Sequence, residues 1–167
     1  MKNILPLILL SLMSATAFAQ QSVGAAAQPF SEKNLSGEIV DLQAQKGKVV
    51  LMAFWSTKCE ICESEIPKLN NLASKYRTKN VEFLGITMNP PKMVRAYLKE
   101  KPFNFNIIPN AFGIILKYAD RTSDGKINMG FPAYFLINQS GTVILKSSGF
   151  NKTGELDSKL DELLEKE

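Results

Sequence analysis

The two cysteines of the chain, Cys59 and Cys62, are its best candidates for chemistry, and only two residues separate them. They follow an apolar run at residues 49–55, which predicts a strand, and they stand where a helix is predicted to begin. A helix N-terminus carries about half a positive charge, which favours the reactive thiolate. The pattern predicts thiol–disulfide exchange, in which Cys59 attacks and Cys62, one turn deeper, resolves the mixed disulfide.

Other uses of a cysteine pair fit the sequence less well. A structural zinc site needs about four ligands, and the chain has no histidine and no third cysteine. A structural disulfide over so short a loop restricts the unfolded chain little and therefore stabilises little. Peroxide reduction is disfavoured because no second, distant cysteine is present. A copper-binding or chaperone-like module stays open as the alternative, with Cys59, Cys62 and Met129 as soft ligands for Cu(I).

Residues 1–19 have the pattern of a secretory signal peptide. Lys2 precedes an apolar stretch at residues 4–12, and Ala17-Phe18-Ala19 forms a small-residue cleavage site. The apolar stretch is shorter than the roughly 20 residues that a transmembrane helix needs. We expect cleavage after Ala19, export to the bacterial periplasm and a mature protein that does not span the membrane.

Charge and composition narrow the range of partners. The formal net charge of +4 is too small to indicate binding to nucleic acid or to a membrane surface. Without histidine or a glycine-rich phosphate loop, no cofactor and no metal are expected. An exported dithiol becomes oxidised unless something reduces it. The protein therefore either has a membrane or periplasmic electron donor or acts as an oxidant itself.

Helical and strand patterns alternate along residues 29–167 and predict one α/β domain, which we expect to be monomeric, around a central mixed sheet. The preceding residues 20–28, rich in Gln, Ala and Gly, are expected to be flexible. The polar stretch at 119–128 is expected to be a surface loop. In chain order, we expect a hairpin at 29–47, a strand at 48–55, helices at 59–77 and 91–99 flanking a strand at 81–88, a strand-like stretch at 103–108, a helix at 112–119, a hairpin with strands at 134–138 and 143–147, and a final helix.

These motifs resemble the thioredoxin-like superfamily and, within it, the exported TlpA/ResA-like thiol–disulfide oxidoreductases. Phe54-Trp55-x-x-x-Cys59-x-x-Cys62 is similar to the active-site strand and helix start of that family, and Pro67 to the proline within its active-site helix. Phe131-Pro132 is similar to its cis-proline loop. The resemblance covers roughly residues 29–167. It implies a thioredoxin-like fold with an N-terminal β-hairpin and an inserted helix and strand segment.

The resemblance also implies a substrate-binding surface. Pro132 is expected to have a cis bond to Phe131, which exposes the backbone of Phe131 beside the cysteines. Together with Trp55, these residues are expected to contact an extended segment of the substrate. The implied substrates are exported proteins that contain cysteines. The implied activity is that of a reductant, with a role like that in cytochrome c maturation.

Glu65 is the third expected catalytic residue, after Cys59 and Cys62. It follows Cys62 by three residues, so both can share one face of the helix. In the family that this chain resembles, an acid at this position lies near the dithiol. A nearby negative charge raises the pKa of a thiol, and the carboxylate can relay the proton of the resolving cysteine. The open alternative is a solvated glutamate that pairs with Lys68 or Lys58.

Overall fold

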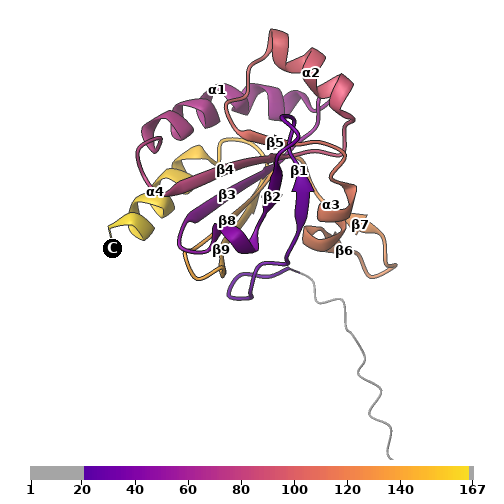
Figure 1. Ribbon diagram of the computed structural model, residues 1–167. Helices are drawn as coiled ribbons and strands as arrows, with labels where there is room; N and C mark the ends of the chain where they lie inside the picture. Colours follow the sequence, from indigo (N-terminus) through magenta and orange to yellow (C-terminus); the bar gives the residue numbers. More distant parts are fainter. Residues whose placement is uncertain (1–20, 166–167) are drawn as a thin grey trace, which may run out of the picture.

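The computed structural model describes residues 21–165. Its five-stranded sheet has the order β5-β4-β3-β8-β9 (Figure 1). β3 is central and fully buried; it pairs in parallel with β4 and antiparallel with β8. The sheet is therefore mixed, as predicted. The strands are β3 (Val49–Phe54), β4 (Val81–Ile86), β5 (Asn106–Ile108), β8 (Ala133–Ile137) and β9 (Val143–Ser148).

The two faces of the sheet pack against different elements because side chains alternate along each strand. Val49, Leu51 and Ala53 of β3 face a core formed with α1 (Glu60–Lys75), α2 (Pro91–Glu100) and α4 (Thr153–Leu164). The intervening residues face α3 (Phe112–Tyr118) and the N-terminal hairpin. We call these the α1 face and the α3 face. Helices on both faces of a mixed sheet confirm the predicted thioredoxin-like architecture.

The predicted N-terminal hairpin is present. It consists of β1 (Ser31–Lys33) and β2 (Ile39–Asp41), which pair antiparallel and are followed by a 3₁₀ turn, η1 (Gln43–Gln45). A second short hairpin, β6 (Asp120–Arg121) with β7 (Ile127–Asn128), lies within the stretch at 119–128 that is expected to be a surface loop. It projects from the body of the molecule beside α3 (Figure 1).

Residues 21–28, part of the segment that is expected to be flexible, pack along the edge of the sheet at β9. Gln21 is buried, and the backbone N–H of Gly24 donates to the carbonyl oxygen of Val143 at 2.8 Å. Val143 donates in return to the oxygen of Ala25 at 3.0 Å. The edge of the sheet at β9 offers unpaired backbone groups, and the segment satisfies them. Composition gave no sign of this edge, because it forms only in the folded sheet.

The predicted signal peptide and its cleavage site lie outside the described residues. Within residues 21–165, no helix combines the length and apolarity needed to cross a bilayer.

Candidate active site

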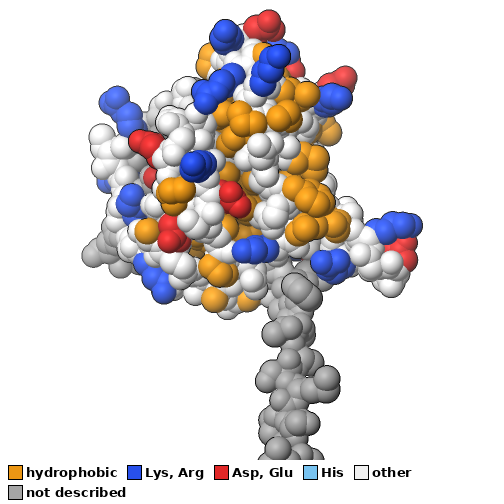
Figure 2. Space-filling model, turned by 45° about the vertical axis from the view of Figure 1, so that its right-hand side comes forward, with side chains coloured by type: hydrophobic (Ala, Val, Ile, Leu, Met, Phe, Trp, Pro, Cys, Tyr) orange, Lys and Arg blue, Asp and Glu red, His pale blue; other side chains and the backbone are white. Residues whose placement is uncertain are grey.

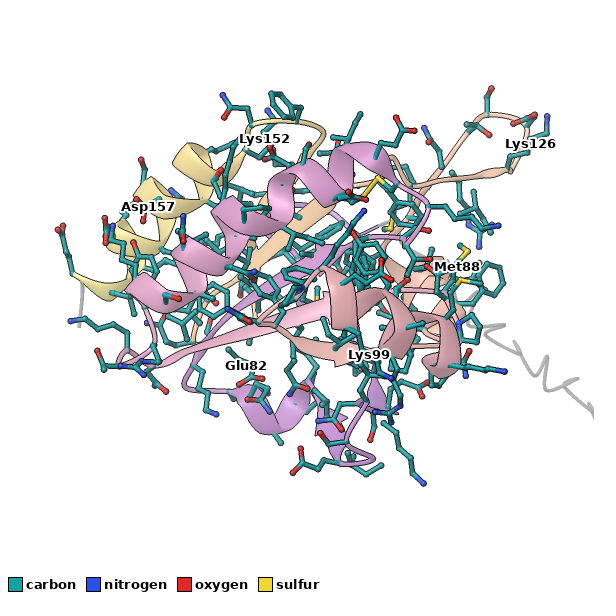
Figure 3. All side chains as sticks on the ribbon, turned by 90° about the horizontal axis from the view of Figure 1, so that it is seen from above. Glu82, Met88, Lys99, Lys126, Lys152 and Asp157 are labelled. Atoms are coloured by element: carbon teal, nitrogen blue, oxygen red, sulfur yellow. A yellow bond between two sulfur atoms is a disulfide. The ribbon has the colours of Figure 1, made fainter. Side chains whose placement is uncertain are left out.

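Cys59 and Cys62 form a disulfide at the start of α1, seen at the end of that helix in Figure 3. Cys59 is the N-cap residue, and its Sγ accepts a hydrogen bond from the backbone N–H of Cys62 at 3.1 Å. Cys62 is only 2% exposed, whereas Cys59 is half-buried. The outer sulfur is therefore the one that another protein can reach, and the inner sulfur lies behind it against the core.

The sheet brings the cysteines and the proline loop to the same end of the molecule. Phe54 at the end of β3 pairs with Ala133 at the start of β8, so the residues after Phe54 lie beside those before Ala133. The bond between Phe131 and Pro132 is cis, as expected. Phe131 is half-buried and packs against both core clusters, including the one that contains Cys62.

Trp55 does not lie where a substrate could touch it. Its side chain is 2% exposed and packs against the rings of Tyr97 and Phe103, at centroid distances of 5.4 and 5.5 Å. The expectation that Trp55 contacts a docked protein is therefore wrong for this conformation. Its large apolar ring is drawn into the core between β3 and α2, where it supports the strand end that carries the cysteine turn.

Glu65 is fully buried, so the solvated alternative is wrong, although its predicted pairing with Lys68 is present. One carboxylate oxygen accepts from the Lys68 ammonium at 2.9 Å, and the other accepts from the backbone N–H of Asn151 at 3.0 Å. Glu65 shares the buried face of α1 with Cys62, one turn along the helix. A buried carboxylate needs such partners, because an unpaired charge in the interior is costly.

The turn between β9 and α4 joins the active-site helix to the proline loop. Within this turn, Asn151 donates its backbone N–H to Glu65, and Gly149 donates its own to the carbonyl oxygen of Pro132 at 2.8 Å. The ammonium of Lys68 lies 4.5 Å from the centre of the Phe150 ring. Sequence reasoning missed this segment. Its Gly-Phe-Asn triplet is typical of a turn, but a turn signal does not say what the turn will contact.

The interior behind the dithiol is apolar and aromatic. Tyr134 pairs in register with Ala53, is fully buried and packs in the same cluster as Cys62. Burial raises the pKa of the Tyr134 hydroxyl, and the negative charge of Glu65 adds to that effect.

The structure lends no support to a metal site. Among residues 21–165, no group of three or more His, Cys, Asp and Glu side chains could hold a metal ion. Met129, the expected third copper ligand, packs against the core of the α3 face, whereas Cys59 and Cys62 belong to the α1 face.

Comparison with known proteins gives consistent results. The model of the AhpC/TSA family matches residues 23–146. The thiol-disulfide oxidoreductase ResA of Bacillus thuringiensis subsp. konkukian is 30% identical over 145 residues, which cover 86% of this chain and 80% of that protein. The thioredoxin-like protein YneN of Bacillus subtilis is 32% identical over 142 residues, covering 83% of this chain and 78% of that protein.

A solved structure shows the same fold. The thiol:disulfide interchange protein of Chlorobium tepidum TLS, a thioredoxin family protein, superimposes with a TM-score of 0.72 at 23% identity, covering 86% of this chain and 99% of that one. The fold alone does not identify an activity, but the sequence relatives and the cysteine pair at the start of α1 do. The chain therefore belongs to the AhpC/TSA family, within the thioredoxin-like proteins, and it is a thiol–disulfide oxidoreductase.

Proposed function

We propose that this oxidoreductase is exported and reduces disulfides in exported proteins that contain cysteines. The observation that carries the proposal is a disulfide with one accessible sulfur, Cys59, and one buried sulfur, Cys62, at the start of α1. Export is supported by the signal-peptide pattern of residues 1–19. The reducing direction follows from the resemblance to ResA-like proteins, whose implied role is in cytochrome c maturation.

In the proposed cycle, the thiolate of Cys59 attacks one sulfur of the substrate disulfide and forms a mixed disulfide, and the other substrate sulfur leaves as a thiolate. Cys62 then loses its proton and attacks the sulfur of Cys59. This step releases the second substrate thiolate and leaves the Cys59–Cys62 disulfide seen in the structure. Two electrons pass from the enzyme to the substrate, and a dithiol donor must restore them.

Two neighbours of the dithiol would assist this cycle. Glu65 is proposed to accept the proton that Cys62 loses, because it lies buried on the same face of α1. Phe131 is proposed to contact the substrate with its backbone, beside Pro132. The position of Glu65 supports the proposed proton transfer, and the position of Phe131 supports the proposed contact with substrate.

The surface beside this end of the molecule suits a protein substrate. Figure 2 shows apolar side chains gathered between α2 at the top and the β6–β7 hairpin at the right. The large apolar residues that are exposed on α2 and α3 include Met93, Phe112 and Leu116. Exposed apolar surface of this kind is typical of protein interaction sites.

The direction of exchange can be tested by measuring the reduction potential against a glutathione or dithiothreitol buffer. A reductant is expected at or below about −200 mV, toward the thioredoxin range, and a value near −120 mV would indicate an oxidant instead. The substrate class can be tested with an oxidised peptide that contains the haem-attachment motif C-x-x-C-H. We expect faster reduction of this peptide than of a matched C-x-x-C-A peptide; equal rates would contradict the cytochrome c role but not the direction.

A further inference from the structure

Asn89 lies in the connection between β4 and α2, far in sequence from the cysteines, yet it contacts the turn that carries them. Its side-chain oxygen accepts hydrogen bonds from the Ser56 hydroxyl at 3.1 Å and from the backbone N–H of Thr57 at 3.0 Å. A third hydrogen bond comes from the hydroxyl of Thr87 at 2.9 Å. One amide oxygen thus links the residues that follow β3, just before Cys59, to the residue that follows β4.

Asn89 is itself held from several sides. Its backbone N–H donates to the Thr87 hydroxyl at 3.2 Å, and Thr87 is fully buried. Its backbone oxygen accepts from the N–H of Asn110 at 3.1 Å. Its side-chain amide donates to the sulfur of Met93 at 3.4 Å. The amide group therefore has a defined orientation, with its oxygen toward the cysteine turn.

The turn that Asn89 contacts leads directly into Cys59. The backbone oxygen of Ser56 accepts from the N–H of Cys59 at 3.1 Å, and the Ser56 hydroxyl accepts from the N–H of Lys58 at 3.3 Å. Cys59 then caps α1 with its sulfur toward the N–H of Cys62. That N–H and the positive end of the helix favour negative charge on the sulfur.

We propose that Asn89 is a positioning residue of the dithiol: by holding the turn at Ser56 and Thr57, it keeps the sulfur of Cys59 over the first turn of α1 and sets how much of Cys59 is thiolate. Without the Asn89 oxygen, three donors lose their shared acceptor, and the turn can move away from the helix. The proposal rests on the dithiol chemistry alone, and it is independent of the direction of exchange and of the substrate.

The test uses the reduced full-length protein and measures the rate at which iodoacetamide alkylates Cys59 between pH 5 and 10. Amide hydrogen exchange of Thr57 reports the hydrogen bond directly. In Asn89→Ala, we expect Thr57 to lose protection, the thiolate titration of Cys59 to move to higher pH, and alkylation at neutral pH to slow by about three- to tenfold. Because alkylation needs no partner protein, the result does not depend on whether the proposed substrate is correct.

A second substitution at Asn89 separates the effect of position from the effect of charge. Asn89→Asp keeps an oxygen acceptor of the same shape, so Thr57 should stay protected, and any change in the Cys59 titration should shrink as salt screens the added charge. The effect of Asn89→Ala should persist at high salt. Met88→Ala is the matched control, because the Met88 side chain is exposed, on the same loop as Asn89 and at the same end of the molecule as the disulfide (Figure 3). In this variant, Cys59 should be alkylated at the wild-type rate.

Ser56→Ala removes one donor to the Asn89 oxygen, together with the acceptor of the Lys58 N–H, and it serves if Asn89→Ala folds poorly. It should shift the Cys59 titration in the same direction by a smaller amount, and it should add little to Asn89→Ala because both act through one contact. The proposal is overturned if Asn89→Ala loses Thr57 protection but keeps the wild-type alkylation profile, or, where Asn89→Ala does not fold, if Ser56→Ala keeps that profile. In that case Asn89 supports only the fold.

Discussion

The two ends of α1 both carry charged groups that tie the helix to the C-terminal part of the chain, but the environments of these charges differ. Near the N-terminal end, Glu65 is fully buried and binds Lys68 and the backbone of Asn151. The cysteines lie on the same end of the helix. We call this group the buried cluster.

At the other end of α1, the Tyr76 hydroxyl lies 2.6 Å from carboxylate oxygens of both Asp157 and Asp161 on α4. Lys75 pairs with the same two carboxylates at 2.7 and 3.0 Å. The side chains of Lys75, Asp157 and Asp161 are exposed. We call this group the exposed cluster.

The difference shows what burial does to a charge. Exposed ion pairs contribute roughly 0–1 kcal/mol each, because water and salt screen them. The Glu65 carboxylate is fully buried although the side chain of its partner Lys68 is 41% exposed, so removing that partner costs more than breaking a surface pair, and the carboxylate charge acts more strongly on its neighbours. The buried cluster can therefore tune the dithiol, whereas the exposed cluster fastens α1 to α4. The following predictions test this division of roles.

Replacing the cysteines should have the largest effect. Cys59→Ser should abolish disulfide exchange, because it removes the accessible sulfur. Cys62→Ser should instead accumulate mixed disulfides on Cys59, since no second sulfur remains to resolve them. Mass spectrometry after incubation with an oxidised substrate protein would show the adduct. If Cys59→Ser were the variant that trapped substrate, the roles of the two sulfurs would be reversed.

Two substitutions in the buried cluster should shift the thiolate titration in opposite directions. Glu65→Gln removes a negative charge while keeping an acceptor for the Asn151 N–H, so thiolate should form at lower pH. Lys68→Met removes the compensating positive charge, so thiolate should form at higher pH. The pH dependence of alkylation measures both. Since Lys68 partly neutralises Glu65 in the wild type, each single shift should be modest.

The matched control for this pair is Lys75→Met, which removes a lysine from the exposed cluster on the same helix. It should leave the thiolate titration unchanged. Identical titration curves for wild type, Glu65→Gln and Lys68→Met would show that the buried cluster does not reach the dithiol. Glu65 would then be a structural residue alone.

The smallest effect is expected from the exposed cluster. Tyr76→Phe removes the hydroxyl that contacts Asp157 and Asp161, and it should lower the free energy of unfolding by about 1 kcal/mol. Disulfide exchange should keep its wild-type rate. Urea unfolding and an insulin reduction assay would measure the two quantities, and a slower exchange reaction would break the proposed division between the two ends of α1.

The stability effect of Tyr76→Phe should also depend on pH. The hydrogen bond from Tyr76 and the contact with Lys75 hold the pKa of Asp161 below its usual range. A lowered carboxyl pKa stabilises the fold above the unfolded value of about 4, and this contribution is lost as the pH falls through the folded value. The difference in stability between wild type and Tyr76→Phe should therefore narrow below about pH 4.

Much of the fold could be predicted because it follows from local patterns. The apolar run at β3 and the helical spacing of Cys62, Ile66 and Leu69 need only neighbouring residues to be recognised. The pairing of the two cysteines also followed from their spacing. The cis bond before Pro132 was expected from the resemblance to the family and is present.

Only the tertiary structure decided how the site is supported. Glu65 is buried because the turn at residues 149–151 closes over it, and Trp55 is buried because α2 brings Tyr97 against it. The contacts of Asn89 could not be recognised in the sequence, because its partners Ser56 and Thr57 lie 33 and 32 residues away. The sequence by itself determined that a cysteine pair stands between a buried strand and the start of a helix, since that depends on residue type and local spacing. Burial and long-range hydrogen bonds depend on which elements meet, and these set the surroundings of the sulfurs.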